Sequence, residues 1–229
     1  MPSLILIPGL GSDAAVWRPT IEALGSSAGC SVGDTLVDDT LPGMADRILD
    51  QAPERFSLAG VSMGGMVALE IMRKAPERVL RLALVDTNPN PDTVEQSAQR
   101  RAANAAVLAT DNLETLAGSS LKYLVHPGAP AAVRSALVEM TLRVGAKTYA
   151  RQNEAVMNRG DQRPILATIK APTIVIVGAQ DIMTPLGFSE QIRDGISGAQ
   201  LHVVPDCGHL PPIEKPDHVA GLLRDWLSH

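Results

Sequence analysis

The feature that most constrains this chain is a Gly-x-Ser-x-Gly pentapeptide, residues 60–64, which separates two segments of different hydrophobic pattern. The short apolar run 56–59 precedes it and predicts a buried strand, whereas the segment 66–74 that follows predicts a helix. The glycines on either side of Ser62 permit a very tight turn, because side chains there would keep the strand and the helix apart. The turn is therefore expected to strain the backbone of Ser62 and to expose its hydroxyl at the positive end of the helix.

Short apolar runs recur along the chain and alternate with helical patterns. The runs are rich in Val, Ile and Leu without clear polar alternation, which is typical of strands that are buried on both faces. Such an alternation predicts an α/β fold with a mostly parallel, doubly wound sheet of about six strands. The predicted strands are residues 4–7, 32–37, 56–61, 80–85, 173–177 and 201–204.

Residues 88–163 interrupt this alternation because they contain no strand-like run. Val133, Leu137 and Met140 form a helical stripe there, and prolines and glycines divide the segment. The pattern predicts an all-helical insertion between the fourth and fifth strands. The remaining residues, 1–87 and 164–229, then form the core of the fold.

Composition excludes several classes of function. The chain has 229 residues, 45% of them hydrophobic, which is enough for one domain with a substantial core. Its net charge of -5 argues against a nucleic-acid partner, and no run approaches the roughly 18 apolar residues of a membrane span. Residues 1–3 lack the charge of a signal peptide, and the two cysteines have no metal-ligand spacing. We therefore expect a cytoplasmic protein without a metal or cofactor and without a membrane partner.

Polar groups and glycine-rich loops follow the predicted strands at the point where each strand ends. The loop 8–11 follows the first run, Ser62 the third, Asp86 the fourth, the loop 178–181 the fifth and the loop 205–209 the sixth. The carboxyl ends of parallel strands meet at one edge of a doubly wound sheet, where ligands bind. The sequence therefore predicts that these groups lie close together.

The residue types at this edge suit nucleophilic catalysis. A serine hydroxyl needs a base, and histidine is the side chain whose ordinary pKa suits that role. His209 is predicted to be the base for Ser62, with the backbone N–H groups of Leu10 and Met63 as the oxyanion donors. The other histidines are predicted to lie where a catalytic base is less suitable: His202 in a strand, His218 in the last helix, His229 at the C-terminus and His126 in the insertion.

Two aspartates are candidates for the acid that orients the base. Asp181 is favoured because its glycine-led loop allows the carboxylate to approach His209. Asp86 is instead predicted to order the loop that enters the insertion.

Aromatic residues make up only 3% of the chain, so a stacked cofactor such as a flavin is not expected. The substrate pocket should instead be lined by aliphatic and methionine side chains. The predicted substrate-binding residues are Gly9, Trp17, Met157 and Met183.

These segments together resemble the α/β-hydrolase fold superfamily, in particular its small bacterial serine carboxylesterases and enol-lactonases. The resemblance rests on residues 7–10, 60–65, 178–181 and 207–209, and on the order Ser, Asp, His along the chain. It implies that residues 88–163 form a cap over the pocket. The chain departs from the family pattern at Pro8, where histidine is usual, and it begins at what resembles the third strand of the full fold. The N-terminal edge strands would then be missing, and the exposed edge would need cover or a partner, such as a homodimer.

The resemblance implies a serine hydrolase that cleaves a small carboxylic ester, lactone or thioester through an acyl-serine intermediate. The Ser-Met-Gly-Gly sequence at residues 62–65 is also similar to that of carbon–carbon bond hydrolases and cofactor-free perhydrolases. A non-catalytic receptor for a small molecule is the alternative from another class, because fold alone does not determine function.

Overall fold

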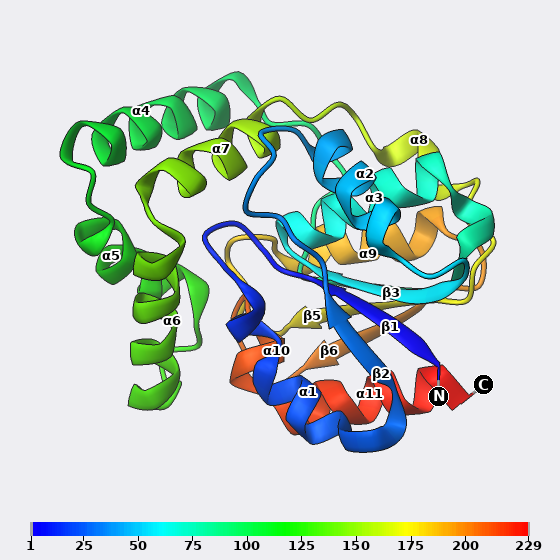
Figure 1. Ribbon diagram of the computed structural model, residues 1–229. Coiled ribbons are helices and arrows are strands. Elements are labelled where there is room, and N and C mark those ends of the chain that lie inside the picture. Colours follow the sequence, from blue (N-terminus) through cyan, green and yellow to red (C-terminus); the bar gives the residue numbers. More distant parts are fainter. Residues whose placement is uncertain (1, 229) are drawn as a thin grey trace.

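The computed structural model describes residues 2–228, and a six-stranded parallel sheet forms its centre (Figure 1). The strand order is β2-β1-β3-β4-β5-β6, and every neighbouring pair is parallel. This arrangement confirms the predicted fold class, and all residues of β3 and β5 are buried, as their apolar runs predict. The strands are β1 (Ser3–Ile7), β2 (Gly29–Val32), β3 (Phe56–Val61), β4 (Val79–Val85), β5 (Thr173–Gly178) and β6 (Gln200–Val204).

The second strand is the one that the sequence placed wrongly. Residues 32–37 were expected to form it, but β2 ends at Val32, and Leu36 donates its N–H to the carboxylate of Asp34 in a turn. Val37 is 52% exposed. Because β2 lies at the edge of the sheet, its residues are only half-buried or exposed, and apolar content is a poor guide to such a strand.

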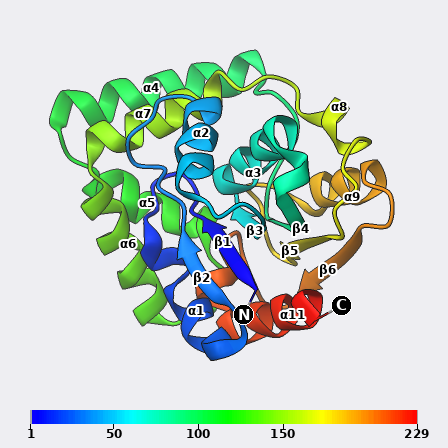
Figure 2. The same cartoon turned by 45° about the vertical axis from the view of Figure 1, so that its right-hand side comes forward.

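Helices cover both faces of the sheet, and successive residues of β1 point to opposite sides. Leu4 and Leu6 pack in the core shared with α1 (Arg18–Leu24) and α11 (Pro216–Ser228). Ile5 and Ile7 pack in the core on the other face. That face is covered by α2 (Leu41–Gln51), α3 (Met63–Lys74) and α9 (Leu186–Gly195), as Figures 1 and 2 show.

Every regular element between β4 and β5 is a helix. Figure 1 shows the first four of these helices beside the sheet, where α4 packs on α7 and α5 on α6. Among the described residues, 2–228, no helix is both long and apolar enough to cross a membrane. The helices of this segment are α4 (Val94–Thr110), α5 (Glu114–Leu124), α6 (Ala131–Val144), α7 (Ala146–Met157) and α8 (Arg163–Leu166).

The end of β5 and the loop that follows β6 are packed backbone to backbone. A Cβ atom added to Gly178 would overlap the carbonyl group of Gly208, so glycine is required at this contact. We expect Gly178→Ala to lower the free energy of unfolding by about 1–3 kcal/mol, because the end of β5 and the loop after β6 must separate. Urea denaturation followed by circular dichroism measures this change.

Gly221→Ala is the matched control for this prediction. Gly221 lies inside α11, and an added Cβ atom would meet no other atom within 4 Å. Since alanine favours the helix and restricts the unfolded chain, the control variant should gain about 0.5–1 kcal/mol. Equal stabilities of the two variants would contradict the predicted loop contact.

Candidate active site

Ser62 occupies the sharp turn between β3 and α3. Its backbone has φ 55° and ψ -118°, a strained conformation for a residue with a side chain, as the glycine spacing predicts. Its N–H donates to the carbonyl of Val85 on the neighbouring strand at 2.9 Å. A Cβ atom on Gly60 would overlap the backbone of Gly64, and one on Gly64 would overlap Ile7. These contacts explain why both flanking positions are glycine.

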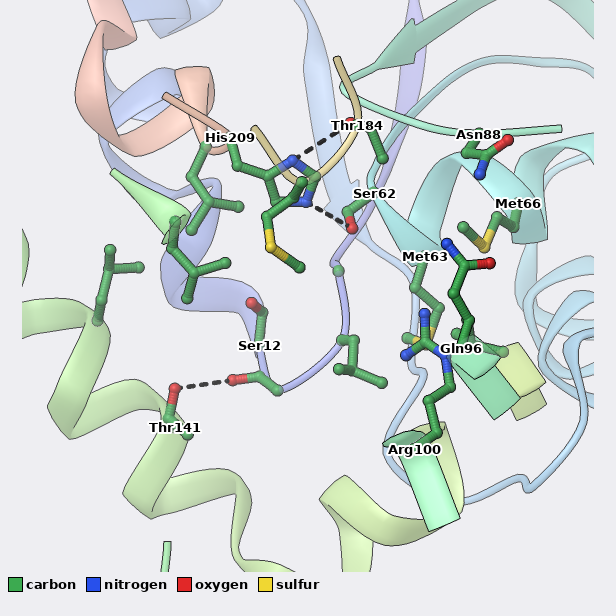
Figure 3. A pocket seen from close by; sticks show the side chains of 18 of the residues that line it. Ser12, Ser62, Met63, Met66, Asn88, Gln96, Arg100, Thr141, Thr184 and His209 are labelled. Carbon is green, nitrogen blue, oxygen red and sulfur yellow. Dashed lines mark hydrogen bonds between the residues drawn. The ribbon is translucent and has the colours of Figure 1, made fainter. Parts of the chain in front are cut away.

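Ser62, His209 and Asp181 are joined by two hydrogen bonds of 2.8 Å. His209 Nε2 lies at that distance from Ser62 Oγ, and His209 Nδ1 lies at the same distance from Asp181 Oδ2. The imidazole is buried between the loops that follow β5 and β6, and Figure 3 shows it pointing toward Ser62. The structure thus brings together the three side chains that the sequence selected.

Asp181 is held as a carboxylate by several donors. Its Oδ1 accepts the N–H groups of Met183 and Thr184 at 2.7 and 3.1 Å, and its Oδ2 accepts the Thr184 hydroxyl at 2.6 Å. Burial by itself raises the pKa of Asp181, but the hydrogen bonds from His209 and Thr184 outweigh that effect and bring the pKa below its ordinary value. Asp181 is therefore ionised at neutral pH and stabilises positive charge on His209.

Asp86 has a different role from the one predicted. It is fully buried, and its Oδ1 accepts the N–H of Gly178 at 2.9 Å, so it fixes the end of β5, where the loop of Asp181 begins, rather than the entry to the insertion. Burial, with the charge of nearby Asp181, raises the pKa of Asp86 well above its ordinary value. The surroundings of Asp86 therefore favour its neutral form, whereas those of Asp181 favour its charged form.

Asp86, Asp181 and His209 also form a group of metal-ligand types, since one donor atom from each lies within 4.8 Å of the others. Both ring nitrogens of His209 are already engaged by Ser62 and Asp181. Both oxygens of Asp181 accept hydrogen bonds as well. The hydrogen bonding thus matches a serine–histidine–aspartate arrangement better than a metal centre.

The two predicted oxyanion donors lie next to Ser62. Met63 is the first residue of α3, where backbone N–H groups have no acceptor within the helix. Leu10 belongs to the loop 8–13 after β1, and both residues line the same cavity as Ser62. Within the described part of the chain, neither N–H donates a hydrogen bond, so both remain available to a ligand.

Side chains of the helical insertion hold the loop 8–13 in place. Gln152, buried on α7, accepts the N–H of Gly11 at 2.8 Å and donates to the carbonyl of Thr35 at 3.1 Å. Thr141 on α6 donates to the carbonyl of Gly11 at 3.3 Å. The sequence interpretation missed Gln152; its only local signal is an amide on the buried face of an amphipathic helix.

A cavity of about 120 Å³ opens beside Ser62. Gly9 and Met183 line it, as expected for substrate-binding residues. The insertion contributes to its wall from α4, α6 and α7, and the sequence interpretation missed most of the residues concerned. They include Gln96, Arg100, Leu137, Met140, Thr141 and Val156, together with Asp92 and Arg159 from the adjoining loops.

Two predicted substrate-binding residues lie elsewhere, so these predictions were wrong. Trp17 is completely buried in the core, and its Nε1 donates to the carbonyl of Ile7 at 3.1 Å. Met157 is absent from the cavity wall, and its sulfur accepts from Arg101 at 3.6 Å. An apolar residue type does not reveal whether a side chain faces the core, a cavity or another helix.

Among the described residues, His209 is the only histidine in the wall of the cavity beside Ser62. His126 Nδ1 accepts the N–H of Gly128 at 3.0 Å, and His126 is not part of the cavity wall. His202 belongs to β6 and His218 to α11, whereas His229 lies outside the described residues.

The raised pKa of Asp86 predicts a pH-dependent difference in stability between the wild type and Asp86→Asn. In the folded protein Asp86 keeps its proton at pH values where the unfolded chain has released it, above about pH 4. This group therefore lowers the stability of the wild type as pH rises toward the folded-state pKa. Because an asparagine side chain does not titrate, the variant should gain stability relative to the wild type as the pH rises above about 4.

Free energies of unfolding from urea denaturation at several pH values measure this difference. Asp34→Asn is the control, because Asp34 lies in a solvent-accessible turn. A difference between wild type and Asp86→Asn that stays constant with pH would contradict the assignment of Asp86 as neutral.

Comparisons with known proteins show which family and which structures this chain is similar to. A thermophilic esterase from Thermogutta terrifontis superimposes with a TM-score of 0.91 at 27% identity, covering 100% of this chain and 90% of that one. A pimeloyl-acyl-carrier-protein methyl ester esterase from Aromatoleum aromaticum is 27% identical over 98% of this chain and 97% of its own length. The corresponding esterase from Nitrosomonas europaea is 28% identical over 94% of this chain and 92% of its own length. The family model described as alpha/beta hydrolase fold matches residues 2–216, so the chain belongs to the alpha/beta hydrolase fold family.

Proposed function

We propose that this hydrolase is a serine carboxylesterase that cleaves a small carboxylic ester, lactone or thioester through an acyl-serine intermediate. The observation that carries the proposal is the continuous hydrogen-bonded chain from Ser62 through His209 to Asp181. The available N–H groups of Leu10 and Met63 beside that serine support it. The esterase names of the similar proteins favour ester cleavage over carbon–carbon bond cleavage, perhydrolysis or non-catalytic binding.

The first half of the proposed reaction acylates the serine. Ser62 Oγ attacks the carbonyl carbon while His209 Nε2 accepts the hydroxyl proton, and the carbonyl oxygen takes up the electron pair. Leu10 and Met63 donate hydrogen bonds to that oxyanion, while Asp181 stabilises the imidazolium. As the carbonyl re-forms, the bond to the leaving oxygen, or to the leaving sulfur of a thioester, breaks, and that atom takes the proton from His209.

The second half repeats these steps with water as the nucleophile. His209 removes a proton from water as the water oxygen attacks the acyl carbon. Collapse of the second oxyanion breaks the bond to Ser62 Oγ, which recovers a proton from His209. The acid product leaves, and the enzyme returns to its starting state.

We also infer that residues 88–163 act as a cap, with residues 1–87 and 164–229 as the catalytic core. Side chains from α4, α6 and α7 in the wall of the cavity support this division. We infer a second role for the insertion, which is to position the loop that carries Leu10. The hydrogen bond from Gly11 to Gln152 supports this role because it holds that loop. A cavity of about 120 Å³ favours a short acyl group.

The direct test of the proposed function is Ser62→Ala. Loss of the nucleophile should reduce hydrolysis of p-nitrophenyl acetate by about 10⁶-fold. A fluorescent phosphonate that reacts with activated serines should label the wild type but not the variant, as seen after gel electrophoresis. Ser12→Ala, which changes another serine of the cavity wall, is the control for labelling. Labelling of the Ser62→Ala protein would place the nucleophile elsewhere.

The two buried aspartates should differ in their effect on rate. Asp181→Asn should lower kcat by about 10⁴-fold, because a neutral amide does not stabilise the imidazolium and favours the wrong tautomer. Asp86→Asn should lower kcat by only about tenfold through looser positioning of Gly178, since Asp86 does not contact the base. Steady-state kinetics with p-nitrophenyl acetate compare the two variants. A larger loss in Asp86→Asn than in Asp181→Asn would reverse the assignment.

A further inference from the structure

A cluster of charged side chains forms part of the wall of the catalytic cavity. Asp92, just before α4, pairs with Arg100 on α4 at 2.6 Å and with Arg159, just after α7, at 2.5 Å. All three residues line the cavity together with Ser62. The cluster therefore faces the same cavity that a substrate of Ser62 would occupy.

Arg159 is a structural member of the cluster. Its side chain is 2% exposed, and its guanidinium donates to the carbonyls of Asn90 and Val156 as well as to Asp92. Burial lowers the pKa of Arg159, and the positive charge of Arg100 lowers it further, although Asp92 opposes both effects. Asp92 and Arg159 thus connect the start of α4 to the end of α7.

Arg100 retains a donor that the protein does not use. Its Nε donates to Asp92 and its Nη1 to Asn153 at 2.7 Å, but its Nη2 has no hydrogen-bond partner among the described residues. Its side chain is 28% exposed. Figure 3 shows Arg100 projecting from α4 toward Met63 in the cavity.

Gln96 lies one turn before Arg100 on the same helix and also lines the cavity. Its Oε1 accepts the N–H of Thr93 at 2.9 Å in a capping box, which fixes the orientation of the amide. The remaining end of the amide, Nε2, is a donor. Figure 3 shows it directed toward Met66, on the same side of the cavity as Arg100.

The cluster carries an excess of positive charge. Among the described residues that line the cavity, Asp92 is the only carboxylate, whereas Arg100 and Arg159 are two guanidinium groups. Charges in a partly buried site interact more strongly than charges in water. An anionic group of a ligand would balance the second guanidinium, and a planar carboxylate matches its geometry best.

We propose that Arg100 and Gln96 bind a free carboxylate of the substrate, so that the preferred substrate is a half-ester of an aliphatic dicarboxylic acid. Met63 and Met66 line the same cavity, and Figure 3 shows Met63 between Ser62 and Arg100, so these side chains contact the methylene chain. This assignment deepens the proposed esterase function and rests on it.

The test compares monomethyl glutarate with methyl pentanoate, two esters whose acyl chains have the same length. The wild type should hydrolyse the carboxylated ester with a kcat/KM at least about tenfold higher, because a charged hydrogen bond adds to the binding. Raising NaCl from about 0.02 to 0.5 M should reduce this preference, since salt screens the attraction. A wild type without such a preference, or with one that salt leaves unchanged, would overturn the proposal.

Arg100→Gln should lower the ratio of the two kcat/KM values by about tenfold to a hundredfold, and Arg100→Lys by less, because lysine keeps the charge. Arg101→Gln is the matched control: it removes the same charge from the next residue of α4, which is exposed and lies outside the cavity wall. The ratio in Arg101→Gln should remain at the wild-type value. An equal change of the kcat/KM ratio in Arg100→Gln and Arg101→Gln would refute the proposed carboxylate site. If Arg100→Gln does not fold, the effect of salt on the preference of the wild type decides the question instead.

The outcomes separate the two levels of inference. Ser62-dependent hydrolysis of methyl pentanoate, with no preference for monomethyl glutarate, would leave the esterase function intact and remove the carboxylate site. Failure of the wild type to hydrolyse either ester would remove both.

Discussion

The close approach of backbone segments at the carboxyl edge of the sheet is the constraint on which the rest of the site depends. The contact of Gly178 with Gly208 brings the loop of Asp181 against the loop of His209. Contacts of Gly60 with Gly64, and of Gly64 with Ile7, bring the serine turn against the loop after β1. Hydrogen bonds of 2.8 Å between side chains from three separate loops are possible only because these backbones touch.

The two buried aspartates illustrate how environment assigns different roles to the same side chain. Asp181 accepts three hydrogen bonds from Met183 and Thr184 and one from His209, which favours its charged form. Asp86 is fully buried beside the charge of Asp181 and accepts only the N–H of Gly178, so its surroundings favour its neutral form. Pairs of carboxyl groups with divergent pKa values are common where one group must remain ionised. Here the neutral member supports the loop that carries the charged one.

The helical insertion is connected to both the reaction centre and the pocket. Through Gln152 and Thr141 it holds Gly11, the neighbour of the proposed oxyanion donor Leu10. Through Arg100 and Gln96 it supplies the polar side chains that distinguish one end of the cavity. Substitutions in these helices can therefore alter turnover as well as selectivity, because the same helices position the loop and line the cavity.

Local patterns were sufficient to predict most of the sheet, the turn at Ser62, and the approach of Asp181 and His209 to that serine. Short apolar runs identify buried strands, glycine spacing identifies the turn, and parallel strands place the residues that follow them at one edge. The tertiary structure alone decided the extent of β2, the burial of Trp17, the role of Asp86 and the contacts of Arg100. The hydrogen bond between Gly11 and Gln152 joins residues 141 positions apart. A sequence pattern reveals the spacing of apolar residues and the local turns of a chain. The hydrogen-bond partner of a polar side chain is instead determined by packing between distant segments.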